Sequence, residues 1–250
     1  MTSYLFDQDI FLRTAHPVAL TSTDRLNPDG SGSVNDYTDG SGLARQVKDL
    51  LGVSTVIDLG TATGTVPLTM REQGLLAVGL EGSEAAQTRG IGAWTVMPDI
   101  VRTCDLGKPF EIVRQDGSPV TFDLVTSGDV LEHIPESDLD CFLDNTLRLM
   151  SPSSWQILEF SVAYNPADKY HQLWDSWEDG TRPGDVTWEA RLAWVREKVE
   201  RRFVIDEGMN SHDWDYTRPS AEERRQHMEA TGTRIAWNRP VWWLRRRVEE

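Results

Sequence analysis

The chain has 250 residues, of which 39% are hydrophobic, and its formal net charge is −15 at pH 7. This length and hydrophobic content are enough for one sizeable core. The acidic balance argues against duplex nucleic acid as a partner, because a negative surface repels the phosphate backbone.

Along the chain, residues 1–40 show no regular pattern and are expected to be irregular. From residue 41 onward, apolar periodicity predicts alternating helices and strands. The predicted strands are 55–59, 75–80, 99–104, 122–126 and 155–160, and the predicted helices are 43–51, one ending near 70, one beginning at 83, and 138–150. Alternation of this kind indicates a parallel sheet covered by helices on both faces, which is a doubly wound α/β fold.

The carboxyl-terminal part of the sequence has a different organisation. Residues 162–218 form a long segment after the fifth strand, and we expect an inserted lid or substrate-binding region there. Residues 219–250 predict a helix at 221–230, followed by two strands at 233–237 and 241–244 that complete a seven-stranded, mostly parallel sheet. The predicted division is therefore 1–40, a cofactor-binding core at 41–161, the insertion at 162–218, and a terminal helix and hairpin.

The cysteines and the N-terminal sequence indicate the cellular setting. Cys104 and Cys141 provide neither a disulfide framework nor a CxxC metal site. The first residues lack the basic stretch and apolar core of a secretory signal, and no apolar run approaches the roughly 18 residues of a membrane span. We expect a cytoplasmic protein with no membrane partner.

A glycine-containing turn follows the first strand, in the sequence Asp-Leu-Gly-Thr-Ala-Thr-Gly at 58–64. Glycines let a ligand approach the backbone, and the next helix offers free N–H groups to an anion. The dehydrogenase fingerprint G-x-G-x-x-G fails here, because positions 62 and 65 are alanine and threonine. A structural turn in another α/β protein is the alternative for this loop alone.

Three downstream segments accompany the loop. Glu81 ends the second strand, where a carboxylate can accept hydrogen bonds from both ribose hydroxyls. Cys-Asp-Leu at 104–106 follows the third strand, and an F-D-L-V strand with an L-E-H-I turn occupies 122–135. In order and spacing, these pieces resemble class I S-adenosylmethionine-dependent methyltransferases, and the overall layout resembles bacterial enzymes that tailor polysaccharides and small molecules.

The resemblance implies S-adenosylmethionine as the cofactor and assigns residues to its parts. The family's usual motif is D-x-G-x-G-x-G, and alanine stands here at the middle glycine. Glu81 would hold the ribose, Asp105 the adenine, and Asp129 the methionine end. The full set of implied cofactor-binding residues is Asp58, Gly60, Thr61, Ala62, Gly64, Glu81, Gly82, Asp105, Leu106 and Asp129.

The expected reaction is methyl transfer to an oxygen or nitrogen atom of a small molecule or glycan. A hydroxyl acceptor needs a base, and His133, after the fourth strand, is one candidate. His171, after the fifth strand, is a second. The alternatives are that His133 only packs the turn and that His171 is a surface histidine.

The spacing Asp129-x-x-Glu132-His133 allows a second interpretation. Two carboxylates and an imidazole on one helical turn can bind a divalent metal, and the array resembles the E-x-x-E-H element of certain metal-assisted O-methyltransferases. A decarboxylating relative and a non-catalytic cofactor-binding subunit are further alternatives. The insertion contains five tryptophans, which can line an acceptor site or pack a lid onto the core: Trp174, Trp177, Trp188, Trp194 and Trp214.

Overall fold

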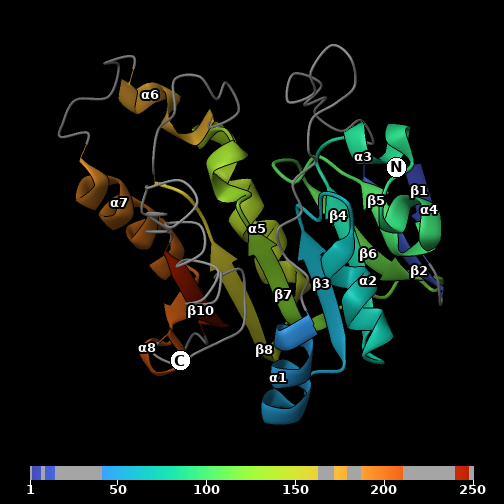
Figure 1. Cartoon of the computed structure of the whole chain (residues 1–250). Coiled ribbons are helices and arrows are strands. Elements are labelled where there is room, and N and C mark those ends of the chain that lie inside the picture. The colour runs from blue at the N-terminus through green and yellow to red at the C-terminus, as the bar shows by residue number, and fades with distance from the viewer. Residues whose placement is uncertain are drawn as a thin grey trace, which may run out of the picture.

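The computed structural model describes residues 2–6, 9–14, 41–162, 172–178, 187–210 and 240–247. In this part of the chain, seven strands form one mixed sheet in the order β5-β4-β3-β7-β8-β10-β9 (Figure 1). The strands are β3 (Thr55–Leu59), β4 (Leu76–Glu81), β5 (Val101–Thr103), β7 (Phe122–Gly128), β8 (Met150–Glu159), β9 (Phe203–Ile205) and β10 (Val241–Arg246). The pairs from β5 to β8 are parallel, and β10 runs antiparallel to both β8 and β9. The predicted doubly wound, mostly parallel sheet with an antiparallel final strand is confirmed.

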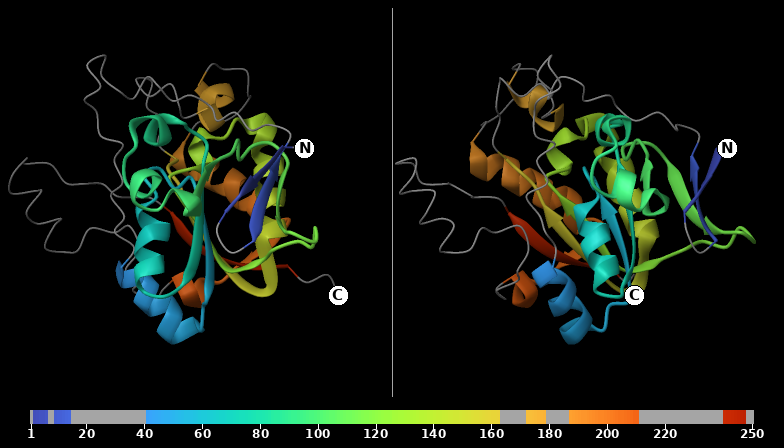
Figure 2. Two further views of the ribbon diagram at one scale, coloured as in Figure 1. Left: turned by 90° about the vertical axis from the view of Figure 1, so that its right-hand side faces the viewer. Right: turned by 45° about the vertical axis from the view of Figure 1, so that its right-hand side comes forward.

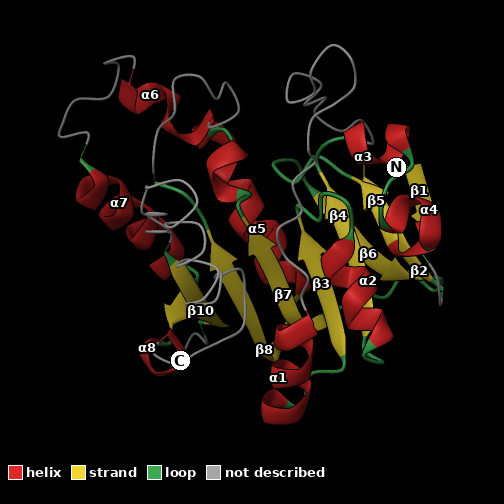
Figure 3. Ribbon diagram, in the orientation of Figure 1, coloured by secondary structure: helices red, strands yellow, loops and turns green. Residues whose placement is uncertain are grey.

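Apolar residues cover both faces of the sheet because consecutive strand residues point to opposite faces. Val56 packs with α1 (Ser41–Leu51) and α2 (Thr65–Glu72), whereas Ile57 belongs to the cluster that includes α5 (Leu139–Leu149) and α7 (Trp188–Glu200). Figures 2 and 3 show these helices around the sheet. The shorter helices are α3 (Ala85–Arg89), α4 (Ala93–Val96), α6 (Asp175–Glu178) and α8 (Glu207–Asn210). No helix in the described ranges is long and apolar enough to span a membrane.

A second, three-stranded antiparallel sheet corrects the expectation for the N-terminal segment. It consists of β1 (Thr2–Leu5), β2 (Ile10–Thr14) and β6 (Phe110–Arg114) in the order β1-β2-β6. Ile10 and Leu12 of β2 are buried in the main core together with Phe110 of β6. Strands β2 and β6 are short and pair with each other across about 100 positions of sequence, so local periodicity indicated neither of them. Residues 15–40 lie outside the described part.

The segment at 162–218 also differs from the expectation of a separate insertion. It contains α7 and β9, and β9 pairs with β10 as the edge strand of the main sheet. The neighbour of β10 at Leu244–Arg246 is therefore β9. The sequence predicts a hairpin that puts residues 233–237 next to β10. The buried residues of α7 are Arg191, Val195 and Val199. Because one of the three is an arginine, the sequence of this helix does not show a regular apolar face. Residues 221–230 and 233–237 are not among those described.

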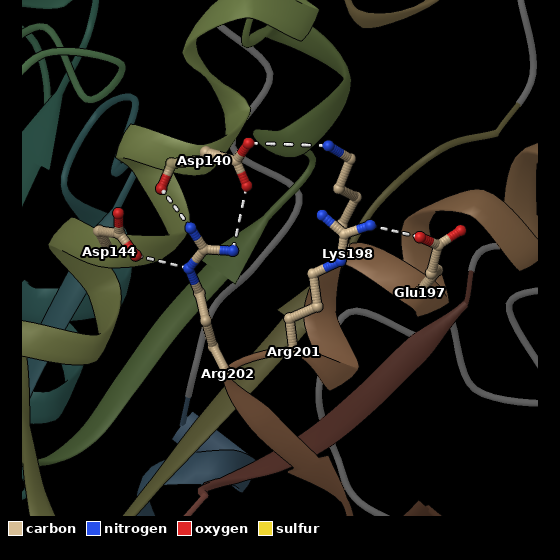
Figure 4. Close-up of polar contacts among 6 residues, drawn as sticks. All are labelled: Asp140, Asp144, Glu197, Lys198, Arg201 and Arg202. Atoms are coloured by element: carbon tan, nitrogen blue, oxygen red, sulfur yellow. Dashed lines mark hydrogen bonds and ion pairs between the residues drawn. The ribbon is translucent and has the colours of Figure 1, made fainter.

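Ion pairs join α7 and the turn between α7 and β9 to α5 (Figure 4). The Arg202 guanidinium reaches Asp140 at 3.0 Å and Asp144 at 2.5 Å, and Lys198 reaches Asp140 at 3.6 Å. Arg202 is the most enclosed of these groups, with 17% of its side chain exposed, and its hydrogen bond to Asp144 raises its pKa despite the opposing effect of burial. Within the described residues, the neighbouring Arg201 pairs with Glu197 of α7. The Arg202 cluster thus fixes the end of α7 against α5.

Candidate functional site

The loop between β3 and α2 has three residues in the left-handed region. The φ values are 78° at Gly60, 49° at Ala62 and 78° at Gly64. The N–H groups of Gly60 and Thr61 both donate to the Leu80 carbonyl, at 2.7 and 2.9 Å. This reversal brings the loop to the end of β4 and starts α2 at once, as the sequence predicts.

Gly60 also connects this loop to the turn after β7. A Cβ at Gly60 would lie 2.0 Å from Cγ2 of Val130, which is far closer than real carbon atoms approach. Only glycine therefore allows Val130 to pack directly on the loop. Through this contact the structure brings together two of the sequence segments that were separated by about 70 residues.

Glu81 stands at the carboxyl end of β4 and faces the loop. Its Oε2 accepts a hydrogen bond from the Ala62 N–H at 2.6 Å, and its Oε1 accepts one from the Ser83 N–H at 2.8 Å. Two backbone groups, one from the loop and one from the chain after β4, therefore fix the orientation of the carboxylate. Gly82 lies between Glu81 and Ser83 in the chain.

Asp58 is buried beneath the loop, with 4% of its surface exposed. The hydroxyl of Thr126 on β7 donates to its Oδ1 at 2.6 Å, because the two residues are register partners across β3 and β7. A charged or polar group at this depth needs such a partner. Asp58 thus supports the loop from within the sheet.

The segment after β5 lies next to Glu81. The Cys104 N–H donates to the Glu81 carbonyl at 2.8 Å, and Asp105 Oδ1 accepts from the Gly107 N–H at 3.0 Å. The Leu106 side chain is buried in the core, and its carbonyl accepts from Asn145 at 2.9 Å. Burial raises the pKa of the Cys104 thiol, and the nearby Asp105 carboxylate adds to this effect, so Cys104 is a packing residue.

The turn after β7 carries Asp129, Glu132 and His133. Asp129 has φ 53°, and its N–H donates to the carbonyl of Glu159 at the end of β8. His133 is partly buried in a 3-10 turn, whereas Glu132 is 1% exposed and accepts from the Ser161 N–H at 3.1 Å. Among the described residues, which include these three, no group of three or more His, Cys, Asp or Glu side chains is arranged to hold a metal ion. The Glu132 carboxylate instead bonds the chain after β8 through the Ser161 N–H.

Three of the tryptophans after β8 pack against each other. The rings of Trp174, Trp177 and Trp194 meet edge to face, with centroids 5.9 to 6.3 Å apart. Trp174 and Trp177 are buried in the main core, which agrees with the packing interpretation, whereas Trp188 is 39% exposed. His171 and Trp214 lie outside the described residues.

One residue that touches the site was not found from the sequence. The indole N–H of Trp94 donates to the Ala62 carbonyl at 2.9 Å. Trp94 belongs to α4, a helix of four residues without any motif, so nothing in a single sequence marks it.

The comparisons with known proteins identify the family. A family model described as a methyltransferase domain matches residues 38–188, which is more than half of the 250 residues. The chain therefore belongs to this methyltransferase family. Its seven-stranded, mostly parallel α/β sheet is that of the class I, S-adenosylmethionine-dependent branch.

The remaining comparisons describe more distant likenesses. The search of curated proteins gives no significant match. Among solved structures, mitomycin 7-O-methyltransferase is 16% identical with a TM-score of 0.45, and the alignment covers 84% of this chain and 53% of that one. A TehB-like SAM-dependent methyltransferase from Corynebacterium glutamicum is 17% identical with a TM-score of 0.46, covering 83% of this chain and 88% of that one. A glycopeptide N-methyltransferase complexed with sinefungin is 17% identical with a TM-score of 0.37, covering 55% and 60%. The chain thus spans about half the length of the first of these proteins.

Proposed function

We propose that this methyltransferase binds S-adenosylmethionine along the carboxyl ends of β3, β4, β5 and β7, and methylates an oxygen or nitrogen atom of a small molecule or glycan. The observation that carries the proposal is the Glu81 carboxylate at the carboxyl end of β4, oriented by the N–H groups of Ala62 in the loop and of Ser83. When bound, the cofactor supplies an electrophilic methyl carbon on a sulfonium sulfur.

The described residues fit this cofactor. Glu81 would accept from the two ribose hydroxyls, and Asp105, beside it, would face the adenine amino group. The left-handed loop at Gly60–Gly64 would present its backbone to the methionine part, with Asp58 supporting it from below. Thr61, Ala62, Gly82 and the backbone of Leu106 would line the same path.

On the acceptor side, Asp129 and His133 follow β7, whose carboxyl end adjoins β3 in the sheet. Asp129 would hold the ammonium group of the methionine end. His133 would accept the proton of a hydroxyl acceptor or orient an amine, since an imidazole can take up a proton near neutral pH. Fixing the acceptor in line with the methyl carbon contributes about 7–11 kcal/mol to such reactions. His171 is a second base candidate from the chain after β8. The charge of −15 favours an acceptor without a polyphosphate backbone.

Titration calorimetry with S-adenosylmethionine tests the cofactor site. The variant Glu81→Gln removes the carboxylate, and Glu84→Gln is its control, because Glu84 is an exposed carboxylate three residues away. Two hydrogen bonds to a charged group are lost, so we expect at least about tenfold weaker binding for Glu81→Gln and unchanged binding for Glu84→Gln. If the unaltered protein does not bind at millimolar cofactor, the proposal is wrong.

Methyl transfer tests the role of His133. Radiolabelled S-adenosylmethionine is incubated with a panel of hydroxylated small molecules and amino sugars, using the unaltered protein and His133→Ala. We expect the variant to bind the cofactor normally but to transfer label to a hydroxyl acceptor at least about a hundredfold more slowly. Equal transfer rates would remove His133 from the reaction.

A further inference from the structure

The segment before β5 packs against the back of the cofactor loop. The Ala93 N–H donates to the Thr63 carbonyl at 2.8 Å, and the Trp94 indole N–H donates to the Ala62 carbonyl at 2.9 Å. A Cβ at Gly92 would lie 2.2 Å from the Thr63 carbonyl oxygen, so the two backbones are in direct contact. Two consecutive carbonyls of the loop are thus bonded from a single short helix.

Gly64 makes the same contact from the loop side. A Cβ there would lie 2.5 Å from the Cβ of Ala93, and Gly64 has φ 78°. The loop and α4 therefore touch along their backbones at both ends of the contact. Trp94 itself is 9% exposed, so its indole is enclosed by the protein.

Ala62 has the conformation that most needs such support. With φ 49° it occupies the left-handed region, where the Cβ of an L residue crowds the following carbonyl oxygen. Glycine adopts this conformation freely, and glycine is the usual residue at this place in the motif. Both peptide groups of Ala62 are bonded: its N–H to Glu81 at 2.6 Å and its carbonyl to Trp94.

We propose that Trp94 is a positioning residue that holds Ala62 in its left-handed conformation, and thereby compensates for the alanine that stands at a glycine position in the cofactor loop. Trp94 acts through the backbone of Ala62 and, beyond it, on the orientation of Glu81. This inference rests on the proposed cofactor site. It adds that the affinity for S-adenosylmethionine depends on the indole N–H of Trp94, which bonds the carbonyl of the same residue whose N–H bonds Glu81.

The first test removes only the indole donor. Trp94→Phe keeps an aromatic ring in the buried position, and Trp188→Phe is the control, since Trp188 is 39% exposed on α7. A hydrogen bond of this kind corresponds to about a three- to tenfold change in a dissociation constant. Calorimetry should give that loss for Trp94→Phe and no change for Trp188→Phe. Cofactor binding by Trp94→Phe at the unaltered affinity would overturn the proposal.

The second test asks whether Trp94 acts through Ala62. Glycine needs no support at positive φ, so Trp94→Phe combined with Ala62→Gly should bind the cofactor within about twofold of Ala62→Gly alone. An indole that served only for core packing, or that contacted the cofactor directly, would not be rescued in this way. Failure of the rescue contradicts the proposed route through the Ala62 backbone.

Hydrogen exchange in the absence of cofactor separates this inference from the proposed function. In the unaltered protein we expect slow exchange of the Ala62 amide and of the Trp94 indole N–H, and in Trp94→Phe at least about tenfold faster exchange of the Ala62 amide. If the unaltered protein binds no S-adenosylmethionine, the cofactor site is wrong whatever the exchange shows. If the protein binds the cofactor and the exchange of Ala62 is unchanged by Trp94→Phe, Trp94 does not hold the loop.

Discussion

Gly60 offers a quantitative test of how the cofactor loop is built. Gly60→Ala places a methyl group 2.0 Å from Cγ2 of Val130, and does so at φ 78°. The left-handed conformation costs an L residue about 1–2 kcal/mol, and overpacking a close-packed site costs about 1–3 kcal/mol. We therefore expect Gly60→Ala to lower the free energy of unfolding by roughly 2–5 kcal/mol.

A second glycine separates the two contributions. Gly52 has φ 67°, close to that of Gly60, but a Cβ there would meet nothing within 4 Å. Gly52→Ala therefore reports the backbone cost alone, about 1 kcal/mol once the lower entropy of the unfolded chain is included. The difference between the two variants measures the steric contact with Val130.

Val130→Ala completes a double-mutant cycle. It removes Cγ2 and Cγ1, so the nearest remaining atom to the new methyl group is the Cβ of Val130 at 3.3 Å. Truncating this buried side chain costs about 1–3 kcal/mol by itself. The double variant should be more stable than the sum of the single changes by about 1–3 kcal/mol. Urea unfolding followed by tryptophan fluorescence gives all four values.

Two results would refute this reasoning. If Gly60→Ala cost no more than Gly52→Ala, the close contact with Val130 would not exist in solution. If the cycle were additive within about 0.5 kcal/mol, Gly60 would be required for some other reason. Either result would also remove the link between the loop after β3 and the turn after β7.

Three other predictions concern residues away from this contact. The Asp123 carboxylate accepts hydrogen bonds from the Ser54 N–H and hydroxyl at 2.9 and 2.7 Å. Burial acts to raise the pKa of Asp123, but these bonds and those from Thr55 outweigh it and lower the pKa. The stabilisation by this carboxylate is therefore present above the unfolded-state pKa and is lost as the pH falls through the folded-state pKa. Asp123→Asn should thus lower the free energy of unfolding by about 1–3 kcal/mol at pH 7 and by much less near pH 2, as measured by urea unfolding. An equal loss at both pH values would show that the charged carboxylate is not responsible. Arg202→Ala should lower the free energy of unfolding by about 1–3 kcal/mol, and by less at high salt, whereas Arg201→Ala should lower it by less than about 0.5 kcal/mol. Equal losses for the two variants in urea unfolding would contradict the bridging role of Arg202. Iodoacetamide should modify the buried Cys104 in the folded protein at least about tenfold more slowly than in urea, as followed by mass spectrometry, and equal rates would show that burial does not protect the thiol.

The sequence predicts the central strands well because their signals are local. The predicted strand 55–59, Thr-Val-Ile-Asp-Leu, is followed directly by Gly60, and the structure has β3 at Thr55–Leu59. Similarly, Glu81 follows an apolar strand directly, and parallel pairing of β3 with β4 brings it to the loop. Both inferences need only period, length and the position of a polar residue at a strand end.

The elements that sequence reasoning missed depend on distant partners. Strands β2, β6 and β9 are five residues long or fewer, and each has at least one partner strand far away in the chain. Helix α7 buries Arg191, which local patterns assign to the surface. The helical spacing of Glu132 allowed a metal interpretation, and its hydrogen bond to the Ser161 N–H, 29 residues later, has no local signal.

Glu132 is one of three side chains that hold the start of the segment after β8. The chain leaving β8 is held at Ser161 by Glu132 and by the indole N–H of Trp174, and at Val162 by Arg191, with hydrogen bonds of 3.0 to 3.1 Å. The Arg191 guanidinium also lies 5.3 Å from the Trp174 ring centroid. A ring that is buried and occupied on its face in this way cannot stack on a sugar or a flat acceptor. These groups instead fix the start of the segment after β8 relative to the turn that carries His133. The buried Trp174 is therefore a poor first target in a screen for acceptor selectivity in the proposed reaction.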